Sequence, residues 1–166
     1  MAKRQTIRLN VNGISYERAV EPRMLLVDFI RHELGLKGTH IGCEQGICGA
    51  CTVILNGESV NSCLLLAIQA DGADILTVEG LSDGEQLSRL QMAFWEHHGL
   101  QCGFCTPGFL MTAHDIVNSS LLVEEGEEVR RLLSGNLCRC TGYQTIVAAV
   151  SEVLRQRREK PSNDKR

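Results

Sequence analysis

The sequence lacks the features that assign a chain to several common classes. No apolar stretch approaches the roughly 18 residues that a membrane span needs, and the polar alternation after Lys3 and Arg4 is unlike a signal peptide. A net charge of −3 over 166 residues indicates no basic face for nucleic acid. With 43% hydrophobic and 22% charged residues, the composition is not that of a disordered chain. We expect a globular cytoplasmic protein with no nucleic-acid partner and no membrane span.

Motifs for substrate chemistry are missing as well. The chain has no G-x-G-x-x-G, no phosphate-binding loop and no serine–histidine–acid set. Of its five histidines, His40 lies close to Cys43 and could be a metal ligand, as in a Rieske centre. Because enough cysteines are available nearby, we favour a position for His40 on the surface or beside the ligands. The sequence therefore predicts no catalytic residue on this chain.

Hydrophobic patterning divides the chain near residue 80. Alternating apolar residues and two Asn-Gly turns predict hairpins in the first part, and a helical pattern ends at Gly35. The expected strands are 7–11, 14–20, 52–55, 58–61 and 75–78, with one helix at 24–34. The second part predicts four helices: one through Leu87 and Trp95 that is closed by Gly99, then 106–118, 125–133 and 143–158. We expect Thr106 to cap the second of these, with Pro107 at its first position.

These elements define an α+β fold. We predict a sheet domain over residues 1–80, a helical domain over residues 81–158 and a polar tail over residues 159–166.

Cysteine is the abnormal component, with eight residues alongside 16 glycines and only 4% aromatic residues. Four disulfides would suit a short secreted scaffold, whereas this chain has enough apolar residues for a core and no export signal. Neighbours such as Cys138 and Cys140 are also poorly placed to bridge one another. Thiolates that bind metal are the favoured interpretation.

The first cysteine set has a specific spacing. Cys43, Cys48 and Cys51 read C-x4-C-x2-C, and Cys63 follows after eleven residues, which is the plant-type pattern for a [2Fe–2S] cluster. Glycines at 42, 46 and 49 would let backbone N–H groups turn toward the sulfurs and stabilise their negative charge. Common zinc sites instead pair two short C-x2-C hooks, so iron–sulfur is favoured here.

The second set is Cys102 and Cys105, followed by Cys138 and Cys140. Both hooks precede predicted helices, whose positive N-terminal dipoles favour thiolates. A thioredoxin-type redox pair would need a βαβ pattern, which is missing. On spacing alone, a structural zinc held by all four cysteines remains open.

Three long motifs together resemble a known family. The segments G-C-E-Q-G-I-C-G-A-C at 42–51, Q-C-G-F-C-T-P-G at 101–108 and G-N-L-C-R-C-T-G-Y at 135–143 look like the small iron–sulfur subunit of molybdenum hydroxylases, the xanthine oxidase-like group. The likeness runs from about residue 6 to residue 155. It includes the carbon monoxide dehydrogenase and N-heterocycle dehydrogenase small subunits.

The resemblance implies a plant-ferredoxin-like β-grasp domain followed by a four-helix bundle. Each domain would hold one [2Fe–2S] cluster, with Cys102, Cys105, Cys138 and Cys140 nearer the molybdenum cofactor and Cys43, Cys48, Cys51 and Cys63 nearer FAD. Gln101 and the backbone at Cys140 would touch a molybdopterin dinucleotide, expected to be the cytosine form, bound mainly by a large subunit. FAD would lie on a medium subunit, in an (αβγ)2 assembly.

The implied function is an electron relay during substrate hydroxylation, with water as the oxygen source. A free-standing ferredoxin-like carrier and a zinc-stabilised interaction module are the alternatives. Carbon monoxide, an aldehyde and an N-heterocycle remain open as substrates, with a weak preference for the last.

Overall fold

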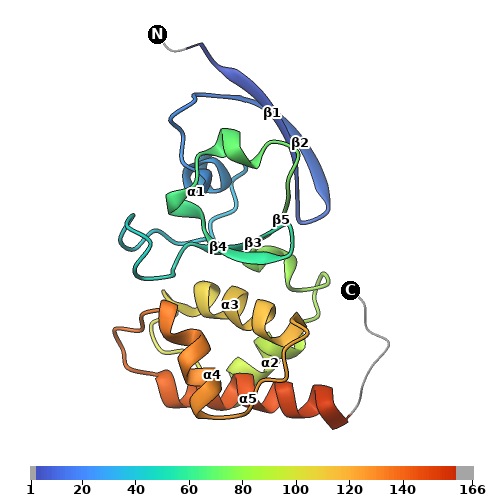
Figure 1. The fold of residues 1–166 in the computed structure, drawn as a ribbon, viewed down its shortest axis with the longest axis vertical. Coiled ribbons are helices and arrows are strands. Elements are labelled where there is room, and N and C mark those ends of the chain that lie inside the picture. Colours follow the sequence, from blue (N-terminus) through green and yellow to red (C-terminus); the bar gives the residue numbers. More distant parts are fainter. Residues whose placement is uncertain (1–2, 160–166) are drawn as a thin grey trace.

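The computed structural model describes residues 3–159, which form two parts stacked along the long axis (Figure 1). The upper part holds strands β1 (Gln5–Val11), β2 (Ile14–Val20), β3 (Thr52–Leu55), β4 (Glu58–Asn61) and β5 (Asp74–Leu76), with α1 (Leu26–Asp28) and short helical turns. The lower part holds α2 (Arg89–Glu96), α3 (Thr106–Asn118), α4 (Glu127–Leu132) and α5 (Tyr143–Glu159). The predicted α+β class is confirmed. Residues 160–166, which include most of the predicted polar tail, lie outside the described residues.

The five strands form one mixed sheet in the order β2-β1-β5-β3-β4. β1 pairs antiparallel with β2 and parallel with β5, while β3 pairs antiparallel with β4 and β5. Both Asn-Gly turns adopt the left-handed backbone that tight hairpins require: φ is 53° and 78° at Asn12 and Gly13, and 50° and 91° at Asn56 and Gly57. The first four predicted strands are confirmed. The fifth ends at Leu76, because residues 78–80 form a 3-10 turn.

One core lies between the sheet and the short helix. The alternating residues Ile7, Leu9 and Val11 are all buried, as the period-two pattern predicts. They pack with Phe29 and Ile30 from the helical segment. That segment is less regular than expected, because α1 continues into a π-helical turn over Phe29–Glu33.

The second core is formed by the four helices. It includes Phe94 from α2, Phe109 from α3 and Ile146 from α5, all nearly inaccessible. The predicted helices are present. The first begins at Arg89 with Ser88 as its cap, so that Leu87 lies outside it, and the third runs over Glu127–Leu132 and then tightens into a 3-10 turn. The prediction that Thr106 caps α3 is wrong. Thr106 is already helical, Cys105 occupies the capping position, and the buried Thr106 hydroxyl has no hydrogen-bond partner.

Helix α3 connects the two parts, because it lies directly beneath β3 and β4 (Figure 1). A Cβ atom at Gly108 would lie 2.2 Å from the carbonyl oxygen of Gly49, so only glycine permits this approach. At the far side of the same junction, Ser59 donates its backbone N–H and its hydroxyl to the Asp115 carboxylate, at 3.2 and 2.5 Å. The helix therefore fixes the sheet part against the helical part.

No helix within residues 3–159 has the length and apolar character of a membrane span.

Candidate metal centres

The first cysteine set lies at one end of the β3–β4 hairpin. Cys51 precedes β3 and Cys63 follows β4. Thr52 pairs with Asn61 across the hairpin, and the N–H of Ser62 donates to the carbonyl of Cys51 at 3.2 Å. The strand register therefore brings Cys63 back to Cys51 across eleven intervening residues.

Backbone N–H groups in the loop before β3 point at sulfur. The N–H groups of Gln45 and Cys48 each donate to Sγ of Cys43 at 3.4 Å. These bonds, that from Gln45 first, lower the pKa of Cys43 to about 7. The loop reaches this shape because Gly46 and Gly49 adopt φ of 72° and 67°. Burial acts in the opposite direction on Cys51 and raises its pKa to about 11.

The second cysteine set lies at the starts of two helices. Cys102 and Cys105 directly precede α3, and Cys138 and Cys140 precede α5. The N–H of Gly142 donates to Sγ of Cys138 at 3.4 Å, as the first loop does to Cys43. A hydrogen bond from the backbone of Phe104 lowers the pKa of Cys102, whereas burial raises that of Cys105 to about 12.

The eight cysteines are all free. Neighbouring thiols lie within interaction range of one another: Cys43 beside Cys48, Cys51 beside Cys63, Cys102 beside Cys140, and Cys105 beside Cys138. Within residues 3–159, no three His, Cys, Asp or Glu side chains converge on a point that could hold a single metal ion. Paired thiols suit a [2Fe–2S] cluster, which takes two thiolates on each of its irons. The donor sets therefore fit two such clusters.

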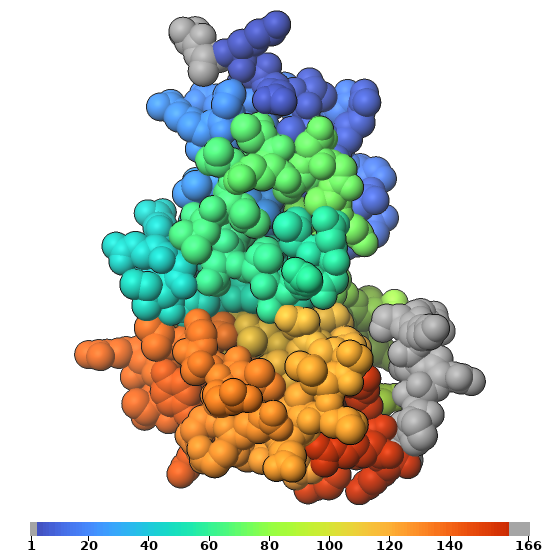
Figure 2. All heavy atoms as spheres, in the orientation of Figure 1, coloured from blue at the N-terminus to red at the C-terminus, as the bar shows by residue number. Residues whose placement is uncertain are grey.

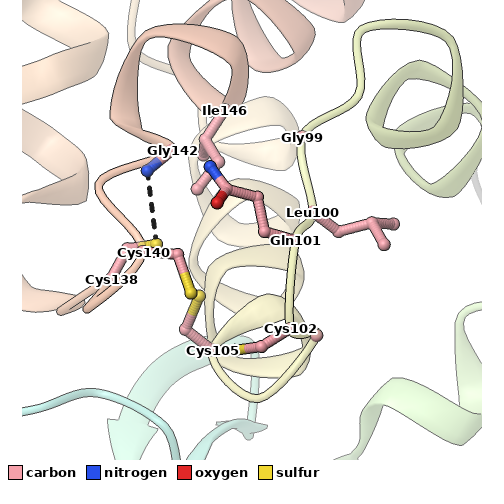
Figure 3. A pocket seen from close by; sticks show the side chains of 10 residues that line it. Gly99, Leu100, Gln101, Cys102, Cys105, Cys138, Cys140, Gly142 and Ile146 are labelled. Atoms are coloured by element: carbon pink, nitrogen blue, oxygen red, sulfur yellow. Dashed lines mark hydrogen bonds between the residues drawn. The ribbon is translucent and has the colours of Figure 1, made fainter.

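Gln101 and Cys140 both line a small pocket at the second cysteine set (Figure 3). The Gln101 side chain extends toward the start of α5, where its Nε2 would lie 3.6 Å from a Cβ atom placed on Gly142. Gln101 is exposed and Cys140 is half-exposed. Both groups are thus accessible to a molecule that docks over this pocket.

The two cysteine loops also touch one another. The loop around residues 42–49 lies directly against the segment around residues 133–140 (Figure 2), and the N–H of Leu137 donates to the carbonyl of Cys48 at 2.9 Å. The buried Asn136 donates through Nδ2 to the carbonyl of Gly49 at 3.0 Å and accepts from the Thr112 hydroxyl at 2.8 Å.

Sequence analysis did not assign Asn136 a role. Its place two residues before Cys138, within a quoted motif, is the signal that could have drawn attention to it.

His40 is not among the cysteine pairs. Its Nδ1 lies 2.7 Å from the carbonyl oxygen of Phe104, and its ring stacks on the Phe104 ring with centroids 4.8 Å apart. The histidine therefore lies beside the cysteine loops and contacts the second loop as well as its own.

Comparisons with known proteins agree with this division into two sites. Residues 9–81 match the family described as "2Fe-2S iron-sulfur cluster binding domain", and residues 77–151 match the "[2Fe-2S] binding domain".

Proteins that match nearly the whole chain are also similar to it in sequence. The chain is 55% identical to the caffeine dehydrogenase subunit gamma of Pseudomonas sp. (strain CBB1) over 149 residues, which is 89% of each chain. It is 54% identical to the nicotine 6-hydroxylase small subunit of Paenarthrobacter nicotinovorans, over 89% of this chain and 88% of that one. A chain in the crystal structure of quinoline 2-oxidoreductase from Pseudomonas putida 86 superimposes with a TM-score of 0.90 at 48% identity, covering 97% of this chain and all of that one. The chain belongs to the small iron–sulfur subunits of the xanthine oxidase-like molybdenum hydroxylases.

Proposed function

We propose that this chain is the electron-transfer subunit of a molybdenum hydroxylase. It connects a molybdopterin-dinucleotide site, of the cytosine form, on a large subunit with FAD on a medium subunit while substrate is hydroxylated with oxygen from water. The observation that carries this proposal is the gathering of eight free cysteines into two sets, one in each part of the molecule, with backbone N–H groups directed at Cys43 and Cys138. No catalytic residue on this chain is proposed.

Each cysteine set would hold one cluster. Cys43 and Cys48 would bind one iron of the first cluster, with Cys51 and Cys63 on the other. In the second cluster, one iron would be bound by Cys102 and Cys140 and the other by Cys105 and Cys138. When bound, each cluster takes up and releases one electron at a time. The N–H groups aimed at Cys43 and Cys138 stabilise charge on those sulfurs, and so help to set the order of the two potentials.

The second cluster would lie nearer the molybdenum cofactor and the first nearer FAD. Gln101 is exposed and Cys140 is half-exposed, which supports a contact of the Gln101 side chain and the Cys140 backbone with the pterin. The chain divides near residue 80 into a sheet domain and a helical domain, supported by their separate cores. An (αβγ)2 assembly in the cytoplasm completes the proposal.

The names of several relatives support a proposal for the substrate class. Caffeine, nicotine and quinoline are all N-heterocycles, so we propose an N-heterocycle as the substrate of the large subunit. The same names disfavour a free-standing carrier, because the two curated relatives are subunits of larger enzymes.

Low-temperature EPR of the dithionite-reduced protein tests the proposal. We expect two distinct [2Fe–2S] signals of about one spin each, together with copurification of two larger chains. A single signal with bound zinc would assign the second cysteine set to a structural metal. Absence of both signals from protein purified without air would refute electron transfer.

A further inference from the structure

Three hydrogen bonds cross between the two cysteine loops. Two of them come from adjacent residues before Cys138: Leu137 donates its N–H to Cys48, and Asn136 donates its side-chain amide to Gly49. The third joins His40, before the first loop, to Phe104 in the second. This third bond contacts the Cys102–Cys105 hook, whereas the bonds from Leu137 and Asn136 hold the segment before α5.

His40 is anchored on its own side of the junction. Its backbone N–H donates to the carbonyl of Ala50 at 3.2 Å, which closes the loop that carries Cys43 and Cys48. The neighbouring Thr39 is buried, and its carbonyl accepts from Arg31 at 2.7 Å. The position of the imidazole is therefore fixed relative to the first cysteine set.

The other end of the contact is the middle of the hook. Phe104 lies between Cys102 and Cys105, and its carbonyl can only accept, so Nδ1 of His40 is the donor. The His40 ring also stacks on the Phe104 ring, with 20° between the ring planes, and so makes a second contact with Phe104. Within the hook, the N–H of Thr106 donates to the carbonyl of Gly103 at 3.2 Å and that of Phe109 donates to the carbonyl of Cys105 at 3.1 Å, while Cys102 is exposed.

We infer that His40 is a positioning residue for electron transfer between the two clusters. By holding Phe104 through a hydrogen bond and a ring stack, it sets where Cys102 and Cys105 lie relative to the first cysteine loop. The separation and orientation of the two clusters then depend on this side chain in addition to the contacts that α3, Asn136 and Leu137 make across the junction. This inference rests on the proposed function, because it needs both cysteine sets to hold clusters.

The two contacts of His40 can be separated by substitution. His40→Phe keeps an aromatic ring for the stack but removes the donor, whereas His40→Asn keeps an N–H donor in the place of Nδ1 and removes the ring. His40→Ala removes both contacts. Ser59→Ala is the matched control: it removes the hydroxyl hydrogen bond to Asp115, another link across the same junction, and leaves the backbone N–H bond, at a residue outside both cysteine loops.

The variants are measured in the complex purified with its larger subunits. Iron content is determined first, and EPR spectra of the fully reduced protein are then recorded at low temperature. Two paramagnetic clusters split one another's lines by an amount that falls steeply with their separation. We expect His40→Ala to retain the iron of wild type but to lose or change this splitting and to shift the second cluster's signal. His40→Phe and His40→Asn should each change it less, and Ser59→Ala not at all.

Unchanged splitting and unchanged signals in His40→Ala would overturn the inference. So would loss of the first cluster's iron from the His40 variants, because that would make the residue a ligand or an assembly factor. Failure of the proposed function is recognised separately, since the wild-type protein itself would then lack one or both cluster signals.

Discussion

Within each cysteine set, the thiols differ in pKa because their surroundings stabilise or destabilise the thiolate. N–H groups of Gln45 and Cys48 point at Cys43 and lower its pKa to about 7. Burial raises the pKa of Cys51 to about 11 and that of Cys105 to about 12. The buried thiols become good ligands only when a metal replaces their proton. Each proposed cluster thus combines thiolates favoured by the protein with thiolates that depend on iron.

Single cysteine substitutions should remove one cluster at a time. We expect Cys63→Ser to abolish the EPR signal of the first cluster and halve the bound iron, while the second signal persists. Cys138→Ser should do the reverse, because the two sets share no thiol pair. Iron analysis and EPR of the reduced variants provide the measurement. Loss of both signals from either variant would contradict independent sites.

His114 should make the folded state sensitive to acid. Burial lowers its pKa below the ordinary 6.5, and the charge of Asp115 only partly opposes this. The unfolded chain therefore binds the proton more readily, so the free energy of unfolding should fall as the pH drops below 6.5. Above that pH both states carry neutral histidine and the contribution is fully present.

Denaturant unfolding at several pH values between about 7.5 and 5.5 tests this dependence. His114→Gln should have a shallower loss of stability toward low pH than wild type. The control is His32→Gln, which changes a histidine whose side chain is 62% exposed. Equal pH slopes in wild type and His114→Gln would show that this histidine carries no such effect.

At the scale of elements, the approach of α3 to the first cysteine loop depends on one glycine. A side chain at Gly108 would meet backbone atoms of Gly49 and Ala50, at 2.2 and 3.1 Å, and backbone cannot rotate away as a side chain can. We expect Gly108→Ala to lower the free energy of unfolding by ~1–3 kcal/mol, as overpacking does elsewhere. It should also shift the EPR signal of the first cluster.

Gly135→Ala is the matched control, because a Cβ atom there would meet nothing within 4 Å. Its stability should remain within about 0.5 kcal/mol of wild type, as for most surface changes. Thermal or denaturant unfolding of the loaded protein compares the two variants. Equal stabilities would mean that the junction adapts to the extra methyl group.

Local sequence patterns predicted most helices and strands correctly. They failed where contacts between distant segments determine the local backbone. The Asn-Gly turns and the alternation of Ile7, Leu9 and Val11 predicted hairpins that the structure contains. The π-helical turn at 29–33 was not predictable, because it arises as the segment packs under the sheet. Thr106 carried a capping residue type, but the chain turns into α3 one residue earlier, at Cys105.

For the candidate sites as well, some features could be predicted from local sequence and others depend on tertiary contacts. Spacing alone grouped the cysteines that the structure brings together. The pairing of Cys102 with Cys140 could not be predicted, because it depends on how α3 and α5 pack. The contact between His40 and Phe104 was also hidden, since 64 residues separate them in sequence. Ligand assignment itself stays a prediction that the cysteine variants test.

For the whole molecule, we expect the larger subunit of the proposed complex to dock on the surface around the second cysteine set. Leu100, Phe104 and Leu137 are 44%, 49% and 51% exposed, and they flank the exposed Cys102 and the adjacent hook at 138–140. An apolar rim around thiolates is the kind of surface that a partner covers. In the proposed function this partner is the large subunit, since the second cluster lies nearer its cofactor.

Leu137→Asp should weaken that docking without removing either cluster. A charge buried at the interface should reduce recovery of the large subunit at least about tenfold, equivalent to ~1.4 kcal/mol. Leu122→Asp is the control, because Leu122 is 91% exposed and follows the far end of α3, a 13-residue helix that is about 20 Å long. The ratio of large to small subunit after affinity purification of the tagged small chain measures the effect. An equal loss from both variants would mean general destabilisation, and no loss from Leu137→Asp would place the interface elsewhere.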